Sequence, residues 1–126
     1  GFSNSPYAGK TWLNRGWCNW YLTQWPEAIE AFGEASQRLP AGLDQARAIF
    51  KLADAQFQWG QFEPALTNYA RLVREHGAIP EVKDGLLDQA YYQMIKAAIQ
   101  TGNQAEAEFA QARLAWGISS RIRVPG

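Results

Sequence analysis

The sequence predicts an all-α protein made of three helical hairpins stacked one upon the next. Apolar residues recur at helical spacing through most of the 126 residues. Short turns centred on Thr23, Gly60 and Gly102 divide these amphipathic runs into pairs, and Pro26 and Pro64 stand where second helices begin. A tight turn between two such helices is typical of an antiparallel hairpin. We therefore expect a domain at 1–116 with hairpins at about 5–40, 43–76 and 81–116, followed by a tail or linker at 117–126.

The first hairpin has clear signals for its helix ends. Ser5 suits an N-cap and Pro6 suits the first helical position, so the first helix should run from there to about Leu22. Pro26 opens the second helix and Pro40 ends it. The apolar stripe expected on that second helix consists of Trp25, Ala28, Ile29, Phe32, Ala35 and Leu39.

The second and third hairpins follow the same plan. Helices are expected at about 43–59 and 62–75, a break at 76–80, and then helices at about 81–100 and 103–116. The last helix is expected to cap the array with a half-solvated outer face. The core residues predicted for the third hairpin are Tyr91, Met94, Ile95, Ala98, Ala107, Ala110 and Leu114.

Composition excludes several classes of function. Twelve Lys and Arg balance twelve Asp and Glu, which argues against a duplex nucleic-acid binder because such proteins carry a dominant basic surface. No apolar run reaches the roughly 20 residues of a membrane span. Cys18 is the single cysteine, so no disulfide can form within the chain. The chain is rich in aromatic side chains for its length, with six Trp, five Tyr and six Phe, so some of them are expected at the surface.

Residues at matching places of the hairpins resemble the tetratricopeptide repeat. The central hairpin carries Ala53, Gly60, Phe62, Ala65 and Tyr69, and the first carries Trp12, Gly16, Ala28, Phe32, Ala35 and Pro40, where the resemblance is closest. Arg15 and Asn19 depart from the pattern, which usually has larger apolar residues there. The resemblance implies a short right-handed solenoid that binds other proteins and has no catalytic activity and no cofactor.

The repeats are longer than the commonest tetratricopeptide unit. Equivalent small residues at Ala28, Ala65 and Ala107 are 37 and 42 residues apart, whereas the commonest repeat has about 34. Such stretched units resemble those of bacterial envelope proteins, namely the Tol-Pal coordinating protein and the outer-membrane assembly lipoprotein. This resemblance implies a bacterial envelope location, although the sequence itself does not establish a compartment.

The sequence offers little for catalysis or metal binding. His76 stands at a helix end, where a cationic side chain is favourable on electrostatic grounds alone. Cys18 lies on an apolar helix and is expected to be a buried, inert thiol. One histidine and one cysteine, far apart in sequence, assemble neither a nucleophile with its base nor a metal site. Glutamates 27, 30 and 34 are expected on a hydrated helix face.

The family resemblance implies that the first helices of the hairpins line a concave groove. The helical face expected to point into it has aromatic rings with basic groups at intervals, which suits a peptide with apolar and acidic side chains. The residues predicted to bind the partner are Lys10, Leu13, Trp17, Trp20, Tyr21, Arg47, Phe50, Asp54, Phe57, Tyr92 and Lys96. Gln58, Gln89, Ile99 and Gln100 complete the same face. The carboxylate clamp of chaperone-binding relatives is absent, since Leu13, Trp17, Gln89 and Gln93 stand at the corresponding places.

Three other interpretations remain open at this stage. The same rings could seal neighbouring hairpins against each other instead of facing a partner. The end hairpins could expose apolar faces through which the protein self-associates into a homo-oligomer or scaffold. Trp20, Tyr21 and Asp54 could surround a small molecule, although no base, nucleophile or metal cluster accompanies them.

Overall fold

The computed structural model describes the chain over residues 6–121, with side chains from 7 to 117, and this part consists of helices joined by short turns, with no strand. Seven helices follow one another as α1 (Pro6–Tyr21), α2 (Trp25–Arg38), α3 (Leu43–Gln58), α4 (Phe62–Glu75), α5 (Pro80–Gly85), α6 (Leu87–Thr101) and α7 (Gln104–Arg121). The predicted all-α fold of stacked helical hairpins is confirmed.

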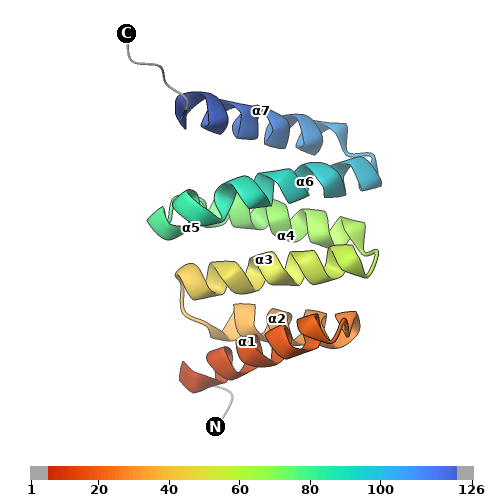
Figure 1. Ribbon diagram of the computed structural model, residues 1–126, viewed down its shortest axis with the longest axis vertical. Coiled ribbons are helices and arrows are strands. Elements are labelled where there is room, and N and C mark those ends of the chain that lie inside the picture. Colours follow the sequence, from red (N-terminus) through yellow and green to blue (C-terminus); the bar gives the residue numbers. More distant parts are fainter. Residues whose placement is uncertain (1–5, 122–126) are drawn as a thin grey trace.

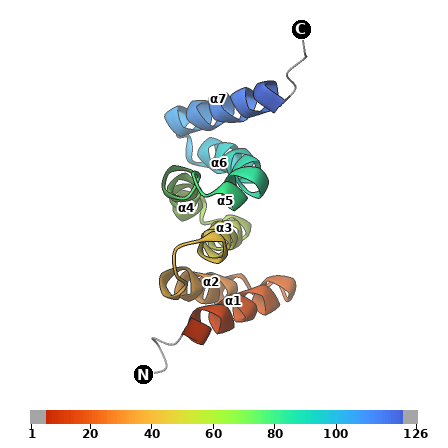
Figure 2. The same cartoon turned by 90° about the vertical axis from the view of Figure 1, so that its left-hand side faces the viewer.

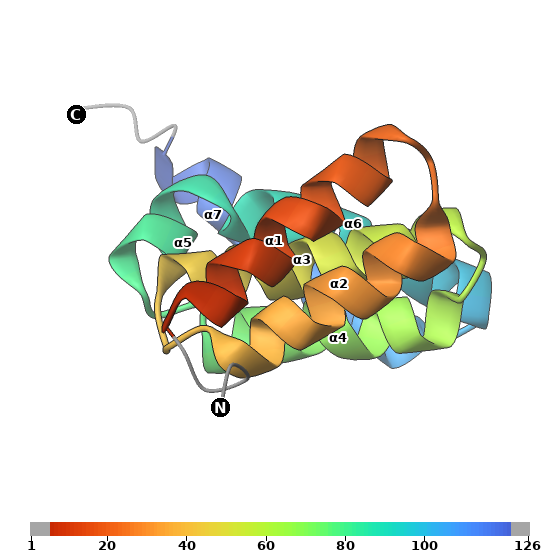
Figure 3. The same ribbon diagram turned by 90° about the horizontal axis from the view of Figure 1, so that it is seen from below.

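The hairpins stack along the long axis of the molecule. Figure 1 shows α1 and α2 at one end, α3 and α4 in the middle, and α6 and α7 at the other end. In the perpendicular view, α3, α5 and α6 lie on one side of the stack, and α2 and α4 lie on the other (Figure 2). Seen along the stack, α1 lies on the side of α3 and α6 (Figure 3). The helices α1, α3 and α6 therefore share one face, which we call the first-helix face.

The three hairpin turns have the same backbone structure. Thr23, Gly60 and Gly102 occupy the left-handed region with φ of 55°, 83° and 71°. Each turn is closed by two backbone hydrogen bonds, the pair that defines a Schellman motif. These bonds run from Thr23 N to Trp20 O and Gln24 N to Asn19 O, from Gly60 N to Phe57 O and Gln61 N to Gln56 O, and from Gly102 N to Ile99 O and Asn103 N to Ala98 O. The turns thus provide a common register for comparing the hairpins.

The core follows the predicted apolar stripes. Tyr69, Phe32, Ile49, Leu72, Met94 and Val82 are the largest fully buried side chains. Close packing in the first hairpin depends on Gly16, because a Cβ placed there would lie 2.6 Å from ring atoms of Phe32. A glycine at this position therefore lets α1 approach α2 closely.

The third hairpin differs from the expectation of one long first helix over about 81–100. The chain forms the short helix α5 and then α6, with a junction at Leu86, where φ is −111°. Gly85 precedes the junction, and glycine has a low helix propensity. Val82 is buried, and Leu86 and Leu87 both pack against the core, so both sides of the junction contribute apolar residues to the core.

The last helix is longer than the sequence suggested. It continues to Arg121, whereas the expected helix ended near Trp116 and the tail was expected from residue 117. A single Gly117 does not stop the helix, because the next proline comes only at Pro125. The N-cap expected at Ser5 and the rest of the tail, residues 122–126, lie outside the described residues.

Candidate functional site

Asp54 is the centre of a buried polar network that joins three helices. Its Oδ1 accepts hydrogen bonds from the phenol of Tyr69 in α4 and, at 3.3 Å, from Nε2 of Gln93 in α6. Its Oδ2 lies 3.3 Å from Nζ of Lys51. Burial raises the pKa of Tyr69 above its ordinary value, and the charge of Asp54 raises it further. The carboxylate is 7% exposed and its oxygens are occupied, so Asp54 connects the second and third hairpins rather than facing solvent.

Lys51 extends this network to the first hairpin. Its ammonium lies 3.4 Å from the ring centroid of Trp20 and 5.0 Å from that of Trp17, both in α1. Burial lowers the pKa of Lys51, while the charge and hydrogen bond of Asp54 oppose that shift. Cations over aromatic faces are attracted by the ring quadrupole, and more strongly where water is excluded. Lys51 therefore holds the indoles of α1 against α3.

A second lysine repeats this arrangement one hairpin further on. Nζ of Lys96 lies 5.3 Å from the ring centroid of Phe57 and 5.5 Å from that of Tyr92. Phe57 and Trp20 occupy the same position relative to their turns, three residues before the left-handed residue. In each case a lysine lies over a ring of the preceding hairpin. The first-helix face therefore carries alternating rings and cations.

The predicted groove residues of α1 have mixed environments. Lys10 is exposed, and Tyr21 is 75% exposed while its ring stacks on Trp17 at 5.9 Å. Leu13, Trp17 and Trp20 are half-buried and pack against the apolar cluster between α1, α2 and α3. These three side chains therefore partly seal the first hairpin against the second, as one alternative reading of the sequence anticipated.

In α3, two of the predicted groove residues are buried. The sequence-based expectation placed Phe50 on an open aromatic surface, but it is 7% exposed and packs edge-on against Tyr69 at 5.9 Å. Asp54 is buried by the network described above. Both side chains turn toward the second and third hairpins because α4 and α6 pack closely against this side of α3. Phe57 is half-buried, and Arg47 is exposed.

The α6 residues form the most open part of the first-helix face. Tyr92 is 58% exposed and Ile99 is 65% exposed. Lys96 is exposed, as are Gln89 and Gln100. Among residues with described side chains, no carboxylate lies within ion-pair distance of Lys96. This end of the face therefore combines an unpaired cation with apolar surface.

A shallow hollow of about 480 Å³ lies beside these residues. Asp54, Lys51 and Gln93 supply its polar wall, and Phe50 and Tyr92 its aromatic one. Its complete lining is Phe50, Lys51, Asp54, Asp88, Gln89, Tyr92, Gln93 and Leu114. The hollow therefore opens at the edge of the same first-helix face.

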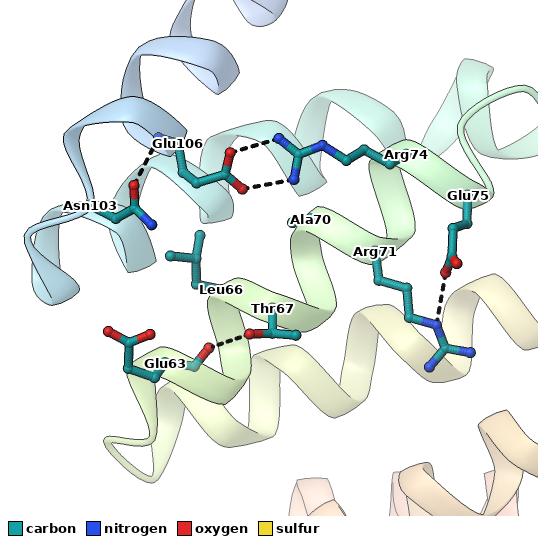
Figure 4. Close-up of a pocket in the computed structure, with 9 residues that line it drawn as sticks. All are labelled: Glu63, Leu66, Thr67, Ala70, Arg71, Arg74, Glu75, Asn103 and Glu106. Atoms are coloured by element: carbon teal, nitrogen blue, oxygen red, sulfur yellow. Dashed lines mark hydrogen bonds and ion pairs between the residues drawn. The ribbon is translucent and has the colours of Figure 1, made fainter.

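The opposite face has a different chemistry. A second hollow, of about 610 Å³, lies between α4 and α7 and is lined mainly by charged residues (Figure 4). Arg74 donates two hydrogen bonds to Glu106, at 2.6 and 2.8 Å, and Arg71 pairs with Glu75 at 3.1 Å. With Glu63, the lining carries three carboxylates and two guanidinium groups, so the hollow has a small acidic excess, and no aromatic ring lines it.

The residues considered for catalysis remain separate. Cys18 is exposed, which corrects the expectation of a buried thiol. His76 caps α4, with its backbone N–H bonded to Leu72 O. Over the described part of the chain, no three His, Cys, Asp or Glu side chains gather to hold a metal ion. Trp20 and Asp54 both contact Lys51, whereas Tyr21 stacks away on Trp17.

Sequence reasoning missed Lys51, and it considered Gln93 only as a place where the carboxylate clamp is absent. Both occupy the same position relative to their turns, nine residues before Gly60 and Gly102. Lys51 also stands three residues before Asp54, a spacing that brings the two side chains together on one helix. Arg47, Asp54 and Gln58 belong to the face predicted from the sequence, and Lys51 extends their polar stripe at helical spacing.

Together the stacked hairpins and the Schellman turns at equivalent positions define a helical repeat protein. A family model described as Tetratricopeptide repeat matches residues 47–77, the central hairpin, which supports assignment to the tetratricopeptide repeat family. No curated protein matches, and no solved structure matches. The match falls on the second hairpin, whereas residue types alone placed the closest resemblance in the first. No helix among residues 6–121 is long and apolar enough to cross a membrane.

Proposed function

We propose that this protein binds a peptide segment of a partner protein along its first-helix face. Tetratricopeptide repeats are generally protein-interaction modules, and the family is generally non-catalytic. The observation that carries the proposal is the alternation of rings and lysines, with Lys51 over Trp20 and Lys96 over Phe57 and Tyr92. Aromatic and cationic side chains on one surface are typical of protein-binding hot spots.

The two lysines would act differently. Lys51 is already paired with Asp54, so it fixes the shape of the surface. Lys96 has no such carboxylate among the described side chains, so it is available to an acidic group of the ligand. Rings beneath a cation keep it desolvated on one side, which strengthens its attraction for an anion. The α6 end is therefore the proposed centre of binding.

The exposed apolar side chains of the first-helix face indicate where apolar groups of the ligand would bind. Tyr92 and Ile99 are more than half exposed and flank Lys96 on α6, and Tyr21 is exposed at the far end on α1. An aromatic ring covered by a ligand buries a large area at low conformational cost. The ligand that fits is a peptide with apolar side chains and at least one Asp or Glu placed near Lys96. Lys10 and Arg47, both exposed, would contact further acidic groups.

The proposal extends to the kind of repeat. The repeat lengths of 37 and 42 residues resemble those of the stretched repeats in bacterial envelope proteins, so we expect the partner to be a protein of the bacterial envelope.

The experiment is selection of a random peptide display library on the immobilised protein. We expect enriched sequences to combine apolar residues with Asp or Glu, and their binding to fall with rising salt. Counter-selection on the Lys96→Glu variant should remove the acidic preference. Enrichment of basic peptides, or identical selections on both proteins, would contradict the proposal.

A further inference from the structure

The two ends of the stack carry surfaces that match the contacts between the hairpins. Inside the molecule, the second helix of one hairpin packs against the first helix of the next. Leu52 of α3 belongs to the apolar cluster against which Ile29 of α2 packs, and its Cδ1 lies 4.0 Å from a Cβ placed on Gly33. Leu66 of α4 and Met94 of α6 occupy the corresponding places in the next contact and share one core cluster. At both inner contacts, these two places therefore hold apolar side chains, one on the second helix and one on the first helix of the next hairpin.

Counting residues from the Schellman turns identifies the equivalent positions at the two ends of the stack. Leu52 and Met94 each stand eight residues before the left-handed residue of their turn, and the equivalent residue in α1 is Arg15. Ile29 and Leu66 each stand six residues after it, and the equivalent residue in α7 is Glu108. The apolar pair of the inner contacts is thus replaced at the ends by one basic and one acidic side chain.

These end residues are open to solvent. Arg15 is exposed with its guanidinium 5.0 Å from the Trp12 ring, and Glu108 is exposed and accepts a hydrogen bond from Gln104 at 3.0 Å. Trp116 adds apolar area at the α7 end, where it is 73% exposed.

Trp116 occupies the place that Arg74 has in the second hairpin, fourteen residues after the turn glycine. Arg74 reaches across to α7, where it pairs with Glu106 (Figure 4), and its guanidinium lies 4.6 Å from the Phe109 ring. In the second hairpin, the side chain at this position therefore bridges one second helix to the next. In the third hairpin the same position holds a large ring, and among the described residues no further helix lies beyond it.

We propose that a second copy of this chain docks head to tail, with the α1 end of one copy seated on the α7 end of another in the register of the inner contacts. Arg15 then meets Glu108, and Trp116 covers the start of the neighbour's α2. Because the two surfaces lie at opposite ends of the molecule, the contact is heterologous and can add further copies. A like-charged pair at this position would prevent docking, so the charges also fix which ends meet.

The test is analytical ultracentrifugation of the wild type, Arg15→Glu, Glu108→Arg and an equimolar mixture of the two variants. We expect the wild-type mass to rise with concentration, and each variant alone to associate at least about tenfold more weakly because like charges then face each other. The mixture should regain association, since the acid introduced at position 15 of one variant meets the base introduced at position 108 of the other. Glu75→Arg, which changes an exposed acid in the middle of the stack, should leave association unchanged.

The outcomes separate the proposal from its competitors. A wild type that stays monomeric at all concentrations would overturn it. A two-fold contact between α7 helices would be insensitive to Arg15→Glu, and that result would also overturn it. Far-ultraviolet circular dichroism of each variant checks that the fold is retained; both residues are exposed, so we expect unchanged helical spectra. Loss of association in the variants without recovery in the mixture would exclude the proposed register.

Discussion

The phenol of Tyr69 donates a hydrogen bond to Oδ1 of Asp54, and this buried pair joins α4 to α3. Gln93 of α6 lies within 3.4 Å of the same phenol oxygen and 3.3 Å of the same carboxylate oxygen. Lys51 balances the charge on the other carboxylate oxygen. The packing of the second and third hairpins therefore depends on a buried polar centre, in which these four side chains supply one another's hydrogen-bond or ion-pair partners.

Tyr69→Phe tests the contribution of this centre to stability. Loss of the phenol leaves Asp54 with one hydrogen bond fewer in a buried site, which should lower the free energy of unfolding by about 1–3 kcal/mol. Urea denaturation followed by circular dichroism measures the change. An unchanged midpoint would show that the network contributes nothing to folding.

The same residue predicts a dependence of stability on alkaline pH. The pKa of Tyr69 is raised in the folded state, first by burial and then by Asp54, so the folded protein retains a proton that the unfolded chain loses near pH 10.0. Its stabilising contribution is full below that pH and declines as the pH rises above it. Lys51, whose pKa is lowered, acts in the opposite direction at somewhat lower pH.

The control for this pH effect is the Tyr69→Phe variant itself. Tyr91 also has a raised pKa, chiefly from burial, so the wild type should lose stability above pH 10 through both residues. The stability of the Tyr69→Phe variant should fall less steeply as the pH rises. Parallel pH profiles of the two proteins would exclude Tyr69 as a source of the alkaline destabilisation.

Thr23→Gly is expected to stabilise the protein. Thr23 adopts the left-handed conformation that glycine adopts in the other two turns, with φ of 55°. A β-branched residue is strained there by roughly 1–2 kcal/mol, and glycine removes that strain. Thermal unfolding should show a higher midpoint. The reverse change, Gly60→Thr, should lower it by a similar amount, because Gly60 has open space around it and only its φ of 83° opposes a side chain.

Gly16→Ala should destabilise the first hairpin. The added Cβ would lie 2.6 Å from the Phe32 ring, so α1 and α2 would have to separate or repack, at a cost of about 1–3 kcal/mol. Gly33→Ala is the matched control within a helix, since the nearest atom to its added Cβ is 4.0 Å away. Gly33→Ala should raise the free energy of unfolding by about 0.5–1 kcal/mol, because alanine has a higher helix propensity than glycine. Equal effects of the two substitutions would contradict the packing described here.

The Arg74 and Glu106 pair predicts a modest sensitivity to acid. The hydrogen bond from Arg74 lowers the pKa of Glu106 below its ordinary value of 4.5. Its contribution is therefore full above that value and is lost as the pH falls through the lowered pKa. Because both side chains are partly exposed, Glu106→Gln should cost less than about 1 kcal/mol at neutral pH. Urea titrations at neutral and acidic pH should show the difference between the proteins vanish in acid.

The helices and turns could be predicted from sequence because they depend on local signals. The spacing of apolar residues located the hairpins, and Gly60 and Gly102 marked their turns. The burial of Phe50 could not be predicted in the same way, since it depends on how closely α4 approaches α3. The junction at Leu86 was missed because a glycine within an apolar helical pattern has no unique local consequence.

The surface proposed for binding was only partly predictable for the same reason. The exposed residues Tyr92 and Lys96 lie where helical periodicity placed them. The position of Lys51 over Trp20 joins two hairpins, and its identification needed their relative placement. Trp17, which is half-buried against Phe32, is thus a less suitable probe of binding than a residue of α6, because its removal would also affect packing.

The most direct test of the proposed function is isothermal titration calorimetry of a library-selected acidic and apolar peptide with the wild type and with Lys96→Glu. Charge reversal at an exposed lysine should leave the helical spectrum unchanged and weaken binding at least about tenfold. Arg71→Glu, on the opposite face, should bind as the wild type does. Equal affinity of the wild type and Lys96→Glu for that peptide would contradict the assignment of the first-helix face as the binding surface.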